Sequence, residues 1–235
     1  MGNPVKPRLV LLALPLLLAA CGGKPDAPVA ADPVAQAPAR EKEPDENVEK
    51  DPLLSEAKIA HVVVPEAFIT PATPAENVDS PASWRAPDGT RWLIATAKDT
   101  HRLVVYDGST GKQLRTVSGP GSELGQMQRP NGIAVIDDLV LVVERDNRRV
   151  QVFQLPDFKP LLAFGADELK QPYGLWVRPQ KDAYEVIVSD NYMSPQNEDL
   201  PPPLAELDQR FKRYHLQRTE GGWKATLAGT SGDTG

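Results

Sequence analysis

The chain has 235 residues, a formal net charge of −6, a pI near 5.2 and 25% charged residues. Lys212 with Arg213 and Arg218 is too small a basic cluster to bind a phosphate backbone, so nucleic acid is not an expected partner. Cys21 is the only cysteine, which excludes an intrachain disulfide and a thiolate metal cage. The three histidines are far apart in the sequence, and this spacing argues against a zinc site.

Residues 1–20 have the pattern of an export signal. Lys6 and Arg8 precede an apolar run, Leu9 to Leu18, that is shorter than the ~20 residues of a membrane-spanning helix. The following Leu18-Ala-Ala-Cys21 resembles a bacterial lipobox, which implies that Cys21 becomes the lipidated N-terminus, carrying acyl chains such as palmitate. Each buried acyl CH₂ contributes ~0.8 kcal/mol, so two or three chains hold a protein on a membrane. Gly22 after the cysteine resembles the pattern of lipoproteins sorted to the outer membrane of the cell envelope, on its periplasmic face or at the cell surface.

Residues 21–75 read as a disordered tether between the lipid and a folded domain. Gly22 to Ala75 contains nine prolines and a single aromatic residue, Phe68, which is too little apolar surface to offset the chain entropy. The charges of Glu41 to Asp51 favour a solvated spacer over a binding tail. Residues 61–64, His-Val-Val-Val, are a candidate strand that closes a propeller ring.

Residues 76–235 carry a repeated β pattern. Gly132 to Val135, Leu139 to Val143 and Val150 to Phe153 are short apolar runs joined by polar turns, which predicts an antiparallel meander. The segment that starts at Pro130 recurs 42 residues later at Pro172, and a weaker copy starts 49 residues earlier at Pro81. Periods of about 40–50 residues are typical of four-stranded propeller blades.

A second landmark recurs in the same order. A basic residue begins an apolar strand that ends on an aromatic residue at 102–106, 149–153 and 210–214, and candidate outer strands follow at 113–117, 161–164 and 223–227. The fold class expected is therefore all-β, a partial β-propeller of three four-stranded antiparallel blades, with Asn191 to Asp208 as an inserted loop. The alternative is three unrelated meanders in a sandwich. A closed propeller has at least about four blades, so we expect these residues to be the front half of a longer protein.

Two family resemblances add expectations. Residues 119–153 resemble an NHL repeat, through a Gly-rich start, the Pro-Asn-Gly-Ile-Ala-Val segment and the Asn-Arg-Arg-Val-Gln-Val-Phe segment. Residues 79–227 resemble the front half of a β-propeller phytase, which implies six blades in the complete protein. The matching motifs are Asp79-Ser-Pro-Ala-Ser-Trp84, Thr96-Ala-Lys98, Val105-Tyr106, Gly111-Lys-Gln-Leu114, Asn147-Arg148, Pro172-Tyr-Gly-Leu175 and Arg213-Tyr-His-Leu216.

The phytase resemblance implies calcium-dependent hydrolysis of phosphate monoesters, with inositol hexakisphosphate as the substrate. By the same resemblance, Asp79 is a calcium ligand, Lys98 and Arg148 bind phosphate, and Tyr173 lies at the metal-bound phosphate. These residue types suit the chemistry, since calcium prefers oxygen ligands and cationic side chains bind phosphate oxygens. No catalytic residue is identified, and each of the four has an alternative role in a turn or in packing. The second function class left open is a non-catalytic NHL-like propeller that binds a protein or glycan.

Overall fold

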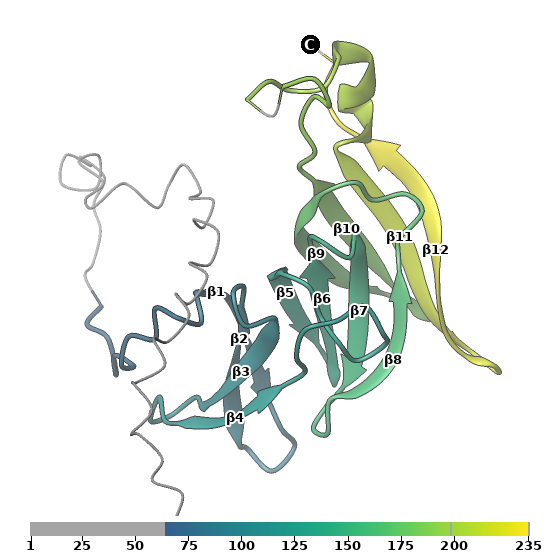
Figure 1. Ribbon diagram of the computed structural model, residues 1–235. Helices are drawn as coiled ribbons and strands as arrows, with labels where there is room; N and C mark the ends of the chain where they lie inside the picture. Colours follow the sequence, from purple (N-terminus) through teal and green to yellow (C-terminus); the bar gives the residue numbers. More distant parts are fainter. Residues whose placement is uncertain (1–63, 198, 235) are drawn as a thin grey trace, which may run out of the picture. The chain divides into compact units, whose positions relative to one another are not determined.

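The computed structural model describes residues 64–197 and 199–234. They form three four-stranded antiparallel sheets, in each of which the strands pair in chain order (Figure 1). Blade 1 contains β1 (Val78–Arg85), β2 (Arg91–Ala97), β3 (Arg102–Asp107) and β4 (Gln113–Val117); blade 2 contains β5 (Pro130–Ile136), β6 (Leu139–Glu144), β7 (Arg149–Gln154) and β8 (Lys159–Phe164); blade 3 contains β9 (Pro172–Gln180), β10 (Ala183–Asp190), β11 (Phe211–Thr219) and β12 (Gly222–Ser231). The all-β prediction and the three sheets are confirmed.

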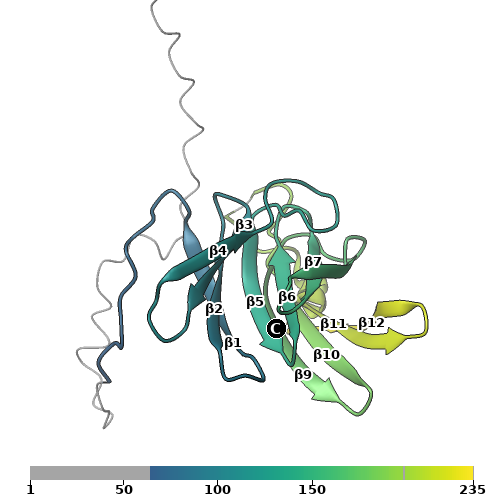
Figure 2. The same ribbon diagram turned by 90° about the horizontal axis from the view of Figure 1, so that it is seen from below.

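The first strand of each sheet lies next to the first strand of the following sheet. β5 contacts β1 on one side and β9 on the other, so the three sheets stand side by side as propeller-like blades (Figure 2). One apolar cluster joins blades 1 and 2, and a second joins blades 2 and 3. Blade 2 is therefore covered on both faces by its neighbours.

The sequence of β6 explains how blade 2 fits between the others. All six residues of β6 are buried, unlike a strand with one face in water, which would alternate between apolar and polar residues. Val140 and Val142 pack in the cluster shared with blade 1, whereas Leu139, Leu141 and Val143 pack in the cluster shared with blade 3. Burying each such side chain contributes roughly 1.5–3 kcal/mol, so β6 is the central strand of the core.

The repeats expected from the sequence occupy equivalent strands, with one correction. Pro130 and Pro172 are the first residues of β5 and β9, as predicted. Pro81, however, lies inside β1, where it follows the same register irregularity that precedes Ile133 in β5. The equivalent of Pro130 in blade 1 is thus Val78, and the prediction that the copy starts at Pro81 was wrong by three residues, because valine there hides the Pro-x-Gly pattern.

The second landmark is confirmed. Arg102 and Arg149 begin β3 and β7, and Arg210 directly precedes β11. The expected outer strands at 113–117, 161–164 and 223–227 lie in β4, β8 and β12, and residues 191–208 lie between β10 and β11 as predicted. That insertion contains the 3₁₀ helix η2 (Leu204–Gln209). Because the landmarks share strand position and register, three unrelated meanders do not fit.

A buried carboxylate ends the second strand of blades 2 and 3. Glu144 and Asp190 are the last residues of β6 and β10, and both are 0% exposed. Glu144 accepts hydrogen bonds from Arg149, Gln151, Asn147 and the backbone N–H of Gln128. Asp190 pairs with Lys212 at 3.0 Å and accepts from the backbone N–H groups of residues 170 and 171. Each carboxylate therefore connects, through hydrogen bonds, the segment just before the first strand of its blade to later strands of the same blade.

The lipid-anchor and tether predictions lie largely outside the described residues. Cys21, the signal sequence and His61 to Val63 of the candidate closing strand all belong to residues 1–63. Val64 is described, and neither Val64 nor residues 65–77 belong to a strand. In the described part of the chain, no helix is both long enough and apolar enough to span a membrane.

Candidate functional site

The second residues of the three innermost strands are Asp79 in β1, Asn131 in β5 and Tyr173 in β9. Since β5 lies between β1 and β9 with equivalent register, these residues form a row across the three blades. We call this the axial row. Two of its three members were expected to be site residues from the sequence.

Lys98 connects the two ends of the axial row. It directly follows β2, and its side chain is 3% exposed. Its Nζ lies 3.3 Å from Asp79 Oδ2 and 5.6 Å from the centre of the Tyr173 ring. The ammonium group of blade 1 therefore reaches across to blade 3, and the structure brings together three of the four residues that the phytase resemblance assigned.

Asn131 is the middle residue of the axial row and is 0% exposed. Neither its Oδ1 nor its Nδ2 has a hydrogen-bond partner among the described residues. Burying an unpaired amide costs free energy, and most such groups in proteins bind another polar group or an ordered water. The carboxamide thus has hydrogen-bonding capacity that the described residues do not use.

Gly132 explains how Asn131 and Tyr173 come to lie on closely spaced strands. A Cβ atom at Gly132 would lie 2.8 Å from Gly174 Cα and 2.9 Å from Tyr173 O, which is closer than real Cβ contacts. The absence of a side chain lets the backbones of β5 and β9 touch at this level. Gly132 and Gly174 are third residues of neighbouring innermost strands, as the repeat assignment predicted.

Other basic residues lie at the same end of the blades as the axial row. Arg145 follows β6 as Lys98 follows β2, and the two backbone N–H groups donate to equivalent carbonyls, those of Arg129 and Asn77. With the Gln171 carboxamide oriented so that its oxygen faces Arg145, this oxygen accepts two hydrogen bonds from the guanidinium, at 2.8 and 3.0 Å.

Arg148 differs from the other predicted site residues. It lies in the turn between β6 and β7 with φ 52°, and its side chain is exposed. Among the described residues its guanidinium makes no hydrogen bond or ion pair with Asp79, Lys98 or Tyr173. The structure therefore does not add Arg148 to the axial row, although its turn lies at the same end of the sheets.

The insertion of blade 3 is held at this end by a buried aromatic residue. Three cations lie near the Tyr192 ring. Lys170 Nζ is 4.0 Å from the ring centre, Arg210 Cζ is 5.1 Å from it and Lys212 Nζ is 5.5 Å from it. Burial raises the pKa of the Tyr192 hydroxyl, which donates to the backbone carbonyl of Glu206. The Glu206 carboxylate, in turn, raises the pKa of Lys170 through a 3.0 Å contact. These contacts attach η2 to the entry of β9.

The residues present do not fit a calcium ion. Calcium takes six to eight oxygen ligands, several of them carboxylates. Asp79 is the single carboxylate in the axial row, and it pairs with Lys98. No group of three or more His, Cys, Asp or Glu residues within the described ranges could hold a metal ion. The described blades therefore provide cationic and amide groups for an anion but no calcium site.

No protein-family model matches the sequence, and no curated protein matches it. Among solved structures, the chain is similar to hydrazine synthase of Kuenenia stuttgartiensis, with 14% identity, a TM-score of 0.37 and coverage of 69% of this chain and 49% of that one. It is also similar to a hypothetical selenium-binding protein from Sulfolobus tokodaii, with 10% identity, a TM-score of 0.36 and coverage of 67% and 51%. The chain spans about half the length of these two structures.

Sequence reasoning missed Asn131 and Arg145. The signal for Asn131 was present in the repeat itself, because it is the second residue of the Pro-Asn-Gly segment and Tyr173 is the second residue of Pro-Tyr-Gly. Starting the first copy at Pro81 placed Asp79 outside the alignment. With Val78 as the start, all three residues occupy the same repeat position.

Proposed function

We propose that the axial row binds the phosphate group of a phosphate monoester, in the manner of a β-propeller phytase acting on inositol phosphates. The observation that carries the proposal is the position of Lys98, a buried cation between Asp79 and Tyr173 on different blades. The unpaired amide of Asn131 lies in the same row and supplies a further donor. Charge-assisted hydrogen bonds of this kind are among the stronger ones in proteins.

Binding requires Lys98 to exchange its contact with Asp79 for the oxygens of the phosphate. The Asp79 carboxylate repels an anion in the row, so the pair as it stands favours the ligand-free state. Hydrolysis is a further step for which the described residues supply no metal site and no assigned base. We therefore propose phosphate binding by these blades, and calcium-dependent hydrolysis only for the protein as a whole.

A non-catalytic propeller that binds a protein or glycan is the second candidate. It requires only the propeller-like blades that the structure describes, without a metal site. The two candidates differ in their response to inositol hexakisphosphate with calcium, since only the enzyme releases inorganic phosphate.

Replacing Lys98 with methionine should weaken binding of inositol hexakisphosphate by at least about tenfold, because a hydrogen bond to a charged group contributes about 1.5–3 kcal/mol. Isothermal titration with the full chain in a calcium-free buffer measures this. Asp79→Asn should have the opposite effect and tighten binding, because it removes the repulsive carboxylate and the competitor for Lys98.

Lys112, an exposed residue of the β3–β4 turn, is the matched control. Lys112→Met should bind like the wild type. Equal affinities of the wild type and Lys98→Met would remove Lys98 from the site. Tight binding without phosphate release, with calcium present, would support the non-catalytic candidate.

We also propose that a lipid on Cys21 anchors the protein in the cell envelope, on the outer membrane. Cys21→Ala should abolish incorporation of labelled palmitate, and the mass of the variant should include the retained signal sequence but no lipid, since the lipobox resemblance places cleavage before Cys21. Mass spectrometry and membrane fractionation measure both effects. An unchanged mass and unchanged membrane partitioning would refute the anchor.

A further inference from the structure

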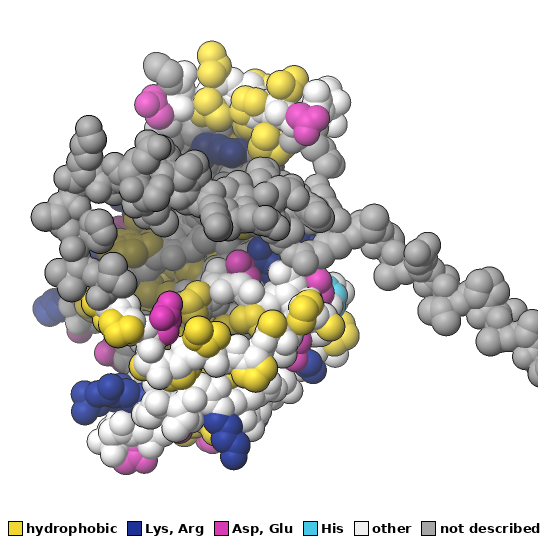
Figure 3. All heavy atoms as spheres, turned by 90° about the vertical axis from the view of Figure 1, so that its left-hand side faces the viewer, with side chains coloured by type: hydrophobic (Ala, Val, Ile, Leu, Met, Phe, Trp, Pro, Cys, Tyr) yellow, Lys and Arg dark blue, Asp and Glu magenta, His cyan; other side chains and the backbone are white. Residues whose placement is uncertain are grey.

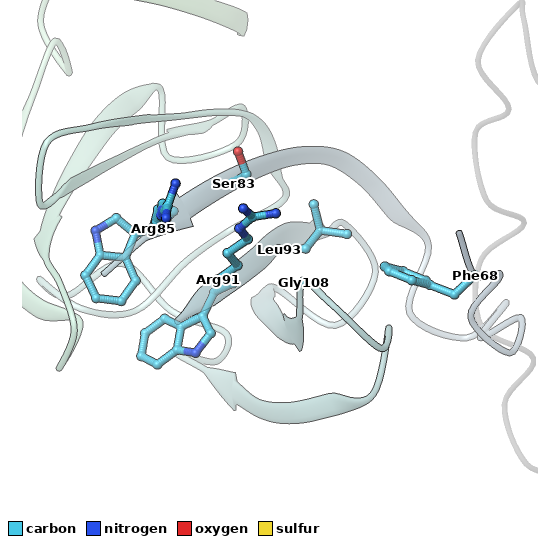
Figure 4. A pocket seen from close by; sticks show the side chains of 8 residues that line it. Phe68, Ser83, Arg85, Arg91, Leu93 and Gly108 are labelled. Atoms are coloured by element: carbon cyan, nitrogen blue, oxygen red, sulfur yellow. The ribbon is translucent and has the colours of Figure 1, made fainter. Parts of the chain in front are cut away.

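A pocket of about 480 Å³ lies at the other end of β1 and β2 from the axial row. Its lining includes Ser83, Arg85, Arg91, Leu93 and Phe68 (Figure 4). Six residues of strand separate Asp79 from Arg85, about 20 Å at ~3.3 Å per residue. The pocket is therefore distinct from the site described above.

Arg85 and Arg91 are direct cross-strand partners in this pocket. Because side chains alternate along a strand, both arginines lie on the sheet face of Ser83 and Leu93, and Figure 4 shows these four residues around the pocket. Like charges placed directly opposite one another in a sheet are destabilising. Two opposed arginines without a counter-charge therefore need an explanation.

No counter-charge is present among the described residues. Neither guanidinium makes an ion pair or hydrogen bond there. Two acidic residues near the pair are occupied in their own turns. Asp88, which lies between the two arginines in the sequence, accepts from the N–H of Thr90, and Asp107, the cross-strand partner of Trp92, accepts from the N–H groups of Ser109 and Thr110. Backbone hydrogen bonds lower the pKa of both carboxyls, so they remain ionised and locally paired. Both arginines are exposed, so a group from outside this part of the molecule can reach them and supply the counter-charge.

The surroundings of the arginines indicate the size of the missing group. Phe68 and Leu93 provide apolar surface beside the two cations, and Ser83 adds a hydroxyl group. On the face shown in Figure 3, Lys and Arg side chains stand in small separate groups among neutral, apolar and acidic side chains. A local pair of cations beside an aromatic ring suits a small ring-shaped anion better than an extended polyanion.

We infer that the Arg85–Arg91 pocket is a second anion site, which binds the phosphate monoester of a sugar-sized molecule. The two guanidinium forks match the two charges of a phosphate monoester near neutral pH. The ring of the ligand packs against Phe68 and Leu93, and its hydroxyl groups reach Ser83. The site lies on blade 1 alone and does not depend on the axial row.

Titration of the full chain with glucose 6-phosphate tests the site, followed by isothermal titration calorimetry and by the fluorescence of Trp84 and Trp92, which also line the pocket. Arg85→Gln and Arg91→Gln should each weaken binding by at least about tenfold. Arg218→Gln, which removes an exposed arginine at the end of β11, should leave it unchanged. In the Lys98→Met background, where the axial row is impaired, Arg85→Gln and Arg91→Gln should still weaken binding by the same factor, which separates this site from the axial row.

Two further measurements guard against misfolding and nonspecific charge effects. The melting temperatures of Arg85→Gln and Arg91→Gln should equal or exceed that of the wild type, since each removes a like-charge contact. Glucose 6-phosphate should bind more tightly than inorganic phosphate, and glucose should not bind. Equal affinity of inorganic phosphate and glucose 6-phosphate would overturn the sugar-sized ligand, and unchanged binding in both arginine variants would overturn the site.

Discussion

Glu144→Ala should lower the free energy of unfolding of the folded domain by about 3–5 kcal/mol, the range found when one partner of a buried charge pair is removed. The carboxylate is 0% exposed and accepts hydrogen bonds from Arg149, Gln151, Asn147 and the backbone of Gln128. Alanine removes this shared acceptor and adds a cavity. The Arg149, Gln151 and Asn147 side chains keep backbone carbonyls as acceptors, whereas the N–H of Gln128 loses the carboxylate oxygen. Each kcal/mol corresponds to about 2–4 °C in melting temperature for a domain of this size, which a thermal scan measures.

Glu123→Ala is the control for this substitution. Glu123 is exposed, and its hydrogen bonds to other described residues are made by its backbone. Its replacement should change stability by less than about 0.5 kcal/mol. Glu144→Gln should fall between the two, because the amide keeps one acceptor but places an NH₂ group among donors. If Glu144→Ala melts at the same temperature as Glu123→Ala, the carboxylate does not connect the strands of blade 2 as described.

Gly132→Ala should separate blades 2 and 3 at their innermost strands. The added methyl group would meet Gly174 Cα at 2.8 Å, Tyr173 O at 2.9 Å and Leu175 N at 3.2 Å, and all three atoms belong to the backbone of β9. Backbone atoms cannot rotate away as a flexible side chain can, so we expect the usual cost of overpacking, about 1–3 kcal/mol. Because Tyr173 belongs to the displaced segment, binding of inositol hexakisphosphate at the axial row should weaken as well.

Two other glycines provide controls for Gly132. Gly119→Ala meets no atom within 4 Å, and Gly174→Ala meets only Ser189 Oγ at 3.4 Å, an ordinary contact. Both should melt close to the wild type. The comparison of Gly132 with Gly174 is informative because the two residues hold the same repeat position, so a loss confined to Gly132 isolates the close approach of β5 to β9. Equal losses at the two positions would contradict it.

Much of the fold was predictable because a blade is a local structure. Each strand pairs with the next along the chain through a short turn, so the apolar runs of residues 130–154 and the recurrence of Pro130 at Pro172 were sufficient to predict the meander and its repeat. The copy in blade 1 was misplaced because Val78 stands where the other blades have proline. A repeat alignment without pairing information cannot detect a shift of three residues.

The candidate site was predictable only in part. The resemblance identified Asp79, Lys98 and Tyr173, which the structure brings together, and Arg148, which lies exposed in a turn. It gave no indication of Asn131, whose side chain is distinguished by burial without a hydrogen-bond partner. Burial and pairing are properties of the packed blades and cannot be read from a residue's type.

The sequence by itself determined the strands, their order and the residues that face the blade interiors, since these depend on short-range pairing and on the alternation of side chains along a strand. The tertiary structure decided which residues from different blades meet. Lys98 reaches Tyr173 across 75 residues of sequence, because glycine at position 132 lets two innermost strands approach and because blade 2 places them side by side. It also revealed that Arg85 and Arg91 line the same pocket, which follows from their register as cross-strand partners.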